Sequence, residues 1–174
     1  MGKKKKFVSE SNVVMTQFVL PNDTNTLNNL MGGRLMHWID IAAAISAQKH
    51  SSRITVTASV DNISFGKPIQ LGNVVTIVAQ VTRAFNSSME IYIKVKADNI
   101  PAGKSELTHS AFVTFVAVDQ MGRPIDVPEA VPETDEEKEL YAGALRRRQL
   151  RLVLAKRMDP KDATELKSLF DNLK

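Results

Sequence analysis

The pattern of apolar and polar positions along the chain predicts one strand, then a buried helix, then four more strands. Residues 12–20 alternate between two faces until Pro21 ends the run. No alternation follows from Arg34 to about His50, and the centre of that stretch, residues 41–47, consists of helix formers that are apolar on almost every side. We therefore expect this helix to be covered on most of its sides.

The four later runs have the period of strands and lie at residues 54–65, 74–85, 89–98 and 106–118. Short turn sequences between the later runs predict antiparallel, hairpin-like connections. A sheet of this kind can curl around the apolar helix, which gives an α+β fold. One curled sheet still leaves a flank of the helix uncovered, so the pattern also predicts self-association.

Beyond Gly122 the composition changes, and three prolines at 124, 128 and 132 predict an extended linker. Thr134 to Glu137 has the signature of a capping box and begins a charged helix that reaches to about Met158. Asp159-Pro160 is expected to cap a second, amphipathic helix with a stripe of Leu166, Leu169, Phe170 and Leu173. The expected division is a basic N-terminal tail (1–11), a domain of sheet and helix (12–128) and a C-terminal helical extension (129–174).

The composition of the 174 residues removes several classes of chemistry. The chain has no cysteine, which excludes disulfides, thiolate metal sites and cysteine nucleophiles and fits a reducing compartment. No apolar run approaches the roughly 20 residues that span a bilayer, and no apolar segment follows the basic start. We therefore predict a cytoplasmic protein with no integral membrane segment.

The net charge of +4 is concentrated in two clusters, Lys3–Lys6 and Arg146–Arg151. A basic surface favours nucleic acid, acidic membranes or a polyanionic small molecule such as coenzyme A. The lysines are equally explained as a solvated tail, and the arginines as a helix face or as ion-pair partners of Glu136, Glu137 and Glu139. Because no aromatic stacking surface or recognition motif accompanies the lysines, we predict no nucleic-acid partner.

Common catalytic motifs are missing. There is no Gly-x-Ser-x-Gly sequence, and Gly103-Lys104-Ser105 resembles the end of a phosphate-binding loop but has Asp98 where that loop needs its first glycine. His37, His50 and His109 lack the spacing of metal ligands, so no metal is expected.

Asp40 and the glycine pair Gly32-Gly33 are the two unusual features that remain. A carboxylate in an apolar helix is costly to bury unless a partner such as His37 or a backbone donor compensates it, so Asp40 is either a reactive acid or an interface residue with a paired charge. At the helix start, free N–H groups could stabilise a carbonyl oxygen that gains negative charge, although the glycines could equally serve only to turn the chain.

Together, these residues resemble the cytosolic acyl-CoA hydrolase branch of the hotdog thioesterases. The resemblance covers about residues 13–151 and rests on these ordered pieces: Pro21-x-Asp23-Thr24-Asn25, Gly32-Gly33-x-Leu35-Met36-x-Trp38-x-Asp40-x-Ala42-Ala43, Thr57-Ala58-Ser59-Val60-Asp61, Phe65-x-x-Pro68-Ile69-x-x-Gly72, Ser87-Ser88-Met89-Glu90, Phe115-Val116-Ala117-Val118-Asp119, Val127-Pro128 and Pro132-Glu133-Thr134-x-x-Glu137. Met31 stands where some other hotdog enzymes have histidine, which argues against the dehydratase branch.

The resemblance implies a curled antiparallel sheet around one long helix, in homodimers that commonly assemble as a trimer of dimers. It also implies acyl-CoA as the partner molecule and no cofactor, since coenzyme A is part of the substrate and product. Asn25 and Asp40 would meet from different subunits in a composite site.

The implied reaction is hydrolysis of the thioester to coenzyme A and a free fatty acid. Asp40 would act as general base on water or attack the thioester to give an anhydride, and the sequence leaves both routes open. Asn25 would orient the water or the carbonyl, and the Gly33 N–H would polarise the thioester oxygen.

The candidate substrate-binding residues are Gly32, Lys67, Arg83, Ser87, Ser88 and Arg147. Met36, Trp38 and Phe65 are expected to set the depth of the pocket. The alternative is a non-enzymatic acyl-CoA-binding sensor on the same fold, which the presence of both Asn25 and Asp40 disfavours.

Overall fold

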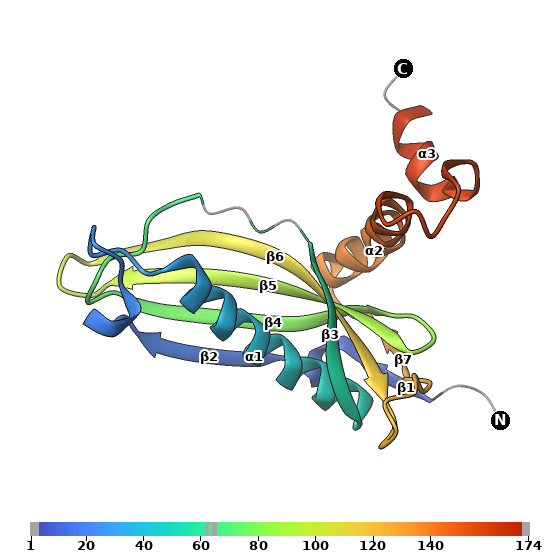
Figure 1. Ribbon diagram of the computed structural model, residues 1–174, viewed down its shortest axis with the longest axis horizontal. Coiled ribbons are helices and arrows are strands. Elements are labelled where there is room, and N and C mark those ends of the chain that lie inside the picture. The colour runs from blue at the N-terminus through green and yellow to red at the C-terminus, as the bar shows by residue number, and fades with distance from the viewer. Residues whose placement is uncertain (1–3, 62, 64–65, 172–174) are drawn as a thin grey trace. The chain divides into compact units, whose positions relative to one another are not determined.

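The computed structural model describes residues 4–61, 63 and 66–171, and the chain divides into two compact units, residues 1–131 and 132–174. The first unit contains a five-stranded antiparallel sheet in the order β2-β4-β5-β6-β3 and the helix α1 (Gly32–Ser51). Figure 1 shows that the sheet curls and that α1 lies along its concave face. The predicted α+β hotdog fold is therefore confirmed. Its strands are β2 (Val13–Phe18), β3 (Ile54–Asp61), β4 (Val74–Ala84), β5 (Ser88–Asn99) and β6 (Lys104–Val118).

The core lies between α1 and the inner face of the sheet. The alternation seen in the sequence of β4, β5 and β6 places one set of side chains on that face, and α1 contributes small alanines that allow close approach. The buried side chains of the strands are Val75, Ile77, Ala79, Val81, Met89, Ile91, Ile93, Val95, Ala111, Val113, Phe115 and Ala117, and those of the helix are Leu35, Trp38, Ile39, Ala42, Ala43 and Ala47.

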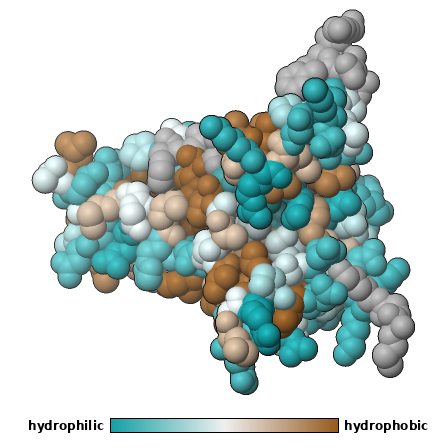
Figure 2. Space-filling model, turned by 45° about the vertical axis from the view of Figure 1, so that its right-hand side comes forward, coloured by the Kyte–Doolittle hydropathy of each residue, from teal (hydrophilic) through white to brown (hydrophobic). Residues whose placement is uncertain are grey.

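One flank of α1 remains uncovered, as the apolar pattern predicted. Ile41 and Ile45 are 36% and 43% exposed, and the neighbouring β3 is an edge strand that also exposes Val56 and Val60. Figure 2 shows apolar side chains that interrupt the polar surface of the molecule. An apolar flank next to an unpaired strand edge is a surface that a second copy of the chain can cover.

Two β-bulges change which side chains face the helix. In β3 the register with β6 shifts between Thr57 and Ser59, so the strict alternation expected from residue 54 onward fails within the strand. As a result, Thr57 and Val60 both turn toward α1. Residues 62, 64 and 65 of the predicted range lie outside the described residues. In β6 the register with β5 shifts at Thr108, where Val95 pairs with His109 but Lys96 pairs with Leu107.

The expected N-terminal tail is folded from Lys5 onward. Lys5–Phe7 forms β1, which pairs in parallel with β7 (Glu129–Val131), and a 3-10 turn (Val8–Ser11) follows. Val8 is buried, and the Ser11 hydroxyl donates to the Val8 carbonyl at 2.7 Å and accepts from the Val81 N–H at 3.0 Å. These contacts anchor the segment despite its lysines, and β7 extends the first unit to Val131.

The second unit contains α2 (Asp135–Leu154), a 3-10 turn (Pro160–Asp162) and α3 (Thr164–Asp171). The predicted capping box is present, with the Thr134 hydroxyl accepting from the Glu137 N–H at 3.2 Å and the Glu137 carboxylate accepting from the Thr134 N–H at 3.1 Å. Asp159 caps the 3-10 turn and not the last helix as expected, because its carboxylate accepts from the Lys161 N–H. Gln149 ties the two helices together by accepting from the Leu166 N–H at 2.9 Å. Leu173 of the predicted stripe lies outside the described residues.

Candidate active site

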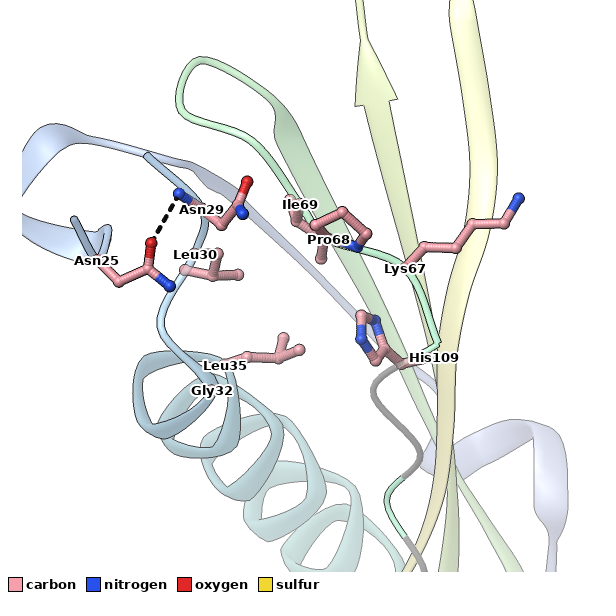
Figure 3. Close-up of a pocket in the computed structure, with 9 residues that line it drawn as sticks. All are labelled: Asn25, Asn29, Leu30, Gly32, Leu35, Lys67, Pro68, Ile69 and His109. Atoms are coloured by element: carbon pink, nitrogen blue, oxygen red, sulfur yellow. Dashed lines mark hydrogen bonds between the residues drawn. The ribbon is translucent and has the colours of Figure 1, made fainter. Parts of the chain in front are cut away.

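The predicted catalytic residues line two separate pockets of the first unit. The first, here called the Asn25 pocket, has a volume of about 370 Å³ and is lined by Asn25, Asn29, Leu30, Gly32, Leu35, Lys67, Pro68, Ile69 and His109 (Figure 3). The second, the Asp40 pocket, has a volume of about 290 Å³ and is lined by Gly33, Met36, His37, Ile39, Asp40, Val60 and Val113. Within one chain, Asn25 and Asp40 are therefore not in the same pocket.

Asn25 is held by its own loop. Its side-chain oxygen accepts from the N–H groups of Leu27 at 2.9 Å and Asn29 at 3.2 Å, and its backbone N–H donates to the Asn29 carbonyl at 2.8 Å. The tight loop requires a positive φ at Asn28, a conformation that asparagine tolerates. Because the loop uses the oxygen, the amide nitrogen is the part of Asn25 that can donate to a ligand.

The start of α1 offers further donors. Met31 occupies the N-cap position, and its side chain makes no capping hydrogen bond to the first N–H groups of the helix. Gly33 is exposed, and apart from its chain neighbours and the backbone of its own helix, no heavy atom lies within 4 Å of the point where a Cβ would stand. The glycine thus leaves open space at the positive end of the helix dipole, where an oxygen that gains negative charge is stabilised.

Asp40 is half-buried and its compensating partner is Thr57. The Thr57 hydroxyl donates to Asp40 Oδ1 at 2.7 Å, a charge-assisted bond between β3 and α1. His37, the partner expected from the helical spacing, is exposed at the rim of the same pocket. The sequence did not assign Thr57 to the site, although the alternation of residues 54–65 placed Thr57 on one face with Thr55. The hydrogen bond to Asp40 shows that Thr57 is directed at α1.

The predicted substrate-binding residues lie at both ends of the sheet. Gly32 and Lys67 line the Asn25 pocket, but Lys67 Nζ forms an ion pair with Glu106 at 2.9 Å and points away from Asn25 in Figure 3. Ser87 lies in the turn after β4, Ser88 begins β5, and the Arg83 guanidinium lies 5.6 Å from the centre of the Phe85 ring. Since Arg83 follows Val74 by nine residues along β4, these groups are on the order of 30 Å from the other end of the strand. One chain does not bring the two sets together.

Arg147, the remaining candidate, belongs to the second unit. Its Nη2 donates to the Leu140 carbonyl at 2.7 Å, and its guanidinium lies over Gly143, where a Cβ would approach it to 2.5 Å. The guanidinium is therefore used in part to pack against its own helix. On the same helix, burial and the nearby charges of Arg151 and Arg157 lower the pKa of Arg148.

The residues that the structure describes contain no cluster of three or more His, Cys, Asp or Glu side chains suited to a metal ion. Among those same residues, no helix has both the length and the apolar character to cross a membrane.

Comparison with known proteins identifies the family. Residues 27–103 match the model of the thioesterase superfamily. The uncharacterized acyl-CoA thioester hydrolase YkhA of Bacillus subtilis is 46% identical over 142 residues, which cover 82% of this chain and 83% of that protein.

Solved structures agree with this. An acyl-CoA hydrolase from Staphylococcus aureus, in complex with butyryl coenzyme A, coenzyme A and coenzyme A disulfide, is 40% identical with a TM-score of 0.81 and covers 87% of this chain and 94% of its own. An apo-hexameric acyl-CoA thioesterase is 38% identical with a TM-score of 0.85 and covers 87% of this chain and 97% of its own.

Three alanine variants of the Staphylococcus enzyme have also been solved, of an Asn, an Asp and a Thr. The intervals between those residues, 15 and 17 positions, equal the intervals between Asn25, Asp40 and Thr57 here. From its sequence relatives and its fold, the chain belongs to the acyl-CoA thioester hydrolases of the thioesterase superfamily.

Proposed function

We propose that the chain hydrolyses acyl-CoA at a composite site, with Asn25 and the N-terminus of α1 from one protomer and Asp40 with Thr57 from its partner. The observation that carries the proposal is the spacing along α1. Gly33 and Asp40 are seven residues apart on one helix, so they are separated by about 10 Å along its axis. A base and an oxyanion donor that act on the same carbonyl group must both lie about 3 Å from the reacting atoms.

A two-fold related copy removes this separation. If two protomers cover each other's exposed flank of α1 and edge of β3, the two helices run antiparallel across the axis. The N-terminus of each helix then approaches the middle of the other, where Asp40 lies. The exposed Ile41, Ile45 and Val56 provide the apolar contact for this dimer. The hexameric relative supports a further assembly as a trimer of dimers.

In this site, Asp40 activates a water molecule or attacks the thioester carbon to give an anhydride that water then opens. Thr57 holds one carboxylate oxygen, so the other oxygen is directed at the water or the carbon. In either route the C–S bond breaks, a C–O bond forms, and coenzyme A leaves as a thiol beside a free carboxylic acid. General-base catalysis supplies typically about 10²–10⁴-fold in rate.

The carbonyl oxygen gains negative charge during the attack, and two donors can meet it. The Asn25 amide nitrogen remains available because the loop engages its oxygen, and the Gly33 N–H points out of the helix start. Each oxyanion donor is worth on the order of 3–4 kcal/mol. Since a thiolate is a good leaving group, these groups suffice without a stronger nucleophile.

Recognition of the coenzyme A phosphates belongs to the assembled protein. Lys67, Arg83, Ser87, Ser88 and Arg147 remain candidates. Neighbouring protomers must bring Lys67 together with Arg83, Ser87 and Ser88, because in one chain these residues lie at opposite ends of the sheet. The butyryl coenzyme A complex of the Staphylococcus relative supports a short acyl group, and a cytoplasmic location remains a prediction from the composition.

A panel of acyl-CoA substrates from acetyl to palmitoyl, with a colorimetric thiol reagent, tests the proposal. Because the chain contains no cysteine, every thiol that reacts comes from the product. We expect thiol release with short-chain substrates. A sensor without catalytic activity would bind acyl-CoA in calorimetry but release no thiol from any member of the panel, and that result would exclude hydrolysis.

A further inference from the structure

We propose that His109 is a substrate-binding residue whose imidazole forms a hydrogen bond with an uncharged polar group, an amide or a hydroxyl, of the bound thioester. The proposal rests on the proposed function and extends it to a residue that neither the motifs nor the catalytic mechanism uses. The imidazole is part of the wall of the Asn25 pocket, and Figure 3 shows its ring turned toward the space enclosed by Leu30, Leu35 and Pro68, opposite Asn25.

A β-bulge in β6 lies directly beside this ring and makes His109 the last residue of the strand's inner row. Along β6, the inward-facing residues are Phe115, Val113, Ala111 and then His109, which pairs with Val95. Strict alternation would make Leu107 the next inward-facing residue, but the extra residue Thr108 turns Leu107 outward, where it is 62% exposed. The bulge therefore ends the apolar inner face of the strand on a histidine. Bulges are common beside active sites, where they redirect a side chain.

The environment selects the neutral form of the ring. His109 is only 6% exposed, and this burial lowers its pKa below the ordinary value of 6.5, so the ring is neutral at physiological pH. A neutral imidazole has one donor and one acceptor nitrogen, which suits an amide or a hydroxyl better than a phosphate. Lys67, the cation of this pocket, pairs with Glu106, so it does not give the pocket a free positive charge.

An acyl-CoA substrate can supply such a group from either of its halves. The pantetheine arm carries two amides and one hydroxyl, and an acyl chain can carry a hydroxyl of its own. The pocket contains Asn25, a donor of the reacting centre, and Gly32, the residue before Gly33, so whichever half enters it continues directly from the thioester. The chemistry that His109 recognises is the same in both cases.

The experiment compares His109→Leu, which removes the polar ring at similar size, with His109→Gln, which keeps a donor and an acceptor. Ser110→Ala is the matched control, because Ser110 is the next residue along β6 and is exposed on the opposite face. For each variant, kcat/KM is measured for butyryl-CoA and 3-hydroxybutyryl-CoA and for hexanoyl-CoA and 6-hydroxyhexanoyl-CoA, and the thermal midpoint is recorded.

We expect His109→Leu to lower kcat/KM at least about tenfold and His109→Gln to restore most of it, as for the loss and recovery of one buried hydrogen bond. An equal loss for all four substrates assigns the contact to the pantetheine arm, and a loss confined to the hydroxylated substrates assigns it to the acyl chain. If His109→Leu is folded and hydrolyses all four like the wild type, or if Leu and Gln lose activity equally, the proposal is wrong. Failure of the wild type to hydrolyse any of them would instead refute the proposed function.

Discussion

A composite site predicts that two inactive variants restore each other's activity. Asn25→Ala removes the loop donor from a site, and Asp40→Asn removes the base while it keeps the size of the side chain. In a dimer that contains one copy of each variant, one site collects both substitutions, and the other site has wild-type Asn25 and wild-type Asp40. The mixed dimer should therefore have one intact site.

The size of the effect follows from the symmetry. Each variant alone is expected to lose at least about a hundredfold in kcat, the lower end of the effect of a general base. When equal amounts of the two variants exchange subunits at random, about half of the dimers are mixed, so about a quarter of all sites are intact. Activity should rise from about 1% to about 25% of the wild type, and the fraction does not depend on how many dimers assemble into the final oligomer.

The assay denatures and refolds the two variants together and separately, and measures thiol release from butyryl-CoA at equal total protein. As a control, the double variant carrying both substitutions is mixed with wild type. Exchange with the double variant destroys both sites of every mixed dimer, so it should halve the activity of the wild-type protein present. Exchange itself is verified without activity, by co-purification of differently tagged subunits. If the mixture of single variants shows only the average of its two components, and the double variant leaves the wild-type activity unchanged although tagged subunits have exchanged, each site lies within one protomer and the proposed arrangement is wrong.

Three further predictions concern single contacts. Thr57→Val should lower kcat roughly tenfold or more because it leaves Asp40 Oδ1 without its donor, whereas Thr57→Ser should retain most of the activity in steady-state assays. Asn25→Asp keeps the oxygen that accepts from Leu27 and Asn29 but loses the amide donor. Its kcat should therefore equal that of Asn25→Ala, while its thermal midpoint should be higher than that of Asn25→Ala. Wild-type turnover in Asn25→Asp would show that the donor is not needed. Burial lowers the pKa of His50, whose Nε2 lies 3.0 Å from the Pro128 carbonyl. As the pH falls, the unfolded chain therefore binds the proton first, and the free energy of unfolding should fall below about pH 6.5. Urea titrations at several pH values should show a weaker fall in His50→Gln.

The order of the elements could be read from the sequence because it depends on local patterns. The two-residue alternation placed β4 and β5, and the lack of alternation together with the run of helix formers placed α1, within a few residues of their ends. The apolar surface on nearly every side of α1 predicted an uncovered flank, where Ile41 and Ile45 are exposed. Asp40 stood out as a carboxylate in an apolar helix, but its catalytic role and the choice of Asn25 came only from the ordered motifs.

The parts that the sequence did not reveal depend on irregularities in the sheet. The bulge beside Thr57 decides which hydroxyl reaches Asp40, and the bulge at Thr108 decides that His109 ends an inner face. A bulge inserts one residue without a marked change in composition, so alternation alone cannot locate it. The folded N-terminal segment was missed for a related reason: two residues, Val8 and Ser11, hold it in place through long-range contacts, whereas the conspicuous lysines suggested solvent.

The most direct test of the account is the turnover of acyl-CoA by Asp40→Asn measured beside the wild type, with binding of coenzyme A followed by calorimetry on the same samples. The account predicts that kcat for butyryl-CoA falls at least about a hundredfold while the affinity for coenzyme A stays within about twofold. A folded Asp40→Asn protein that releases thiol at close to the wild-type rate would contradict the assignment of this carboxylate to the chemistry.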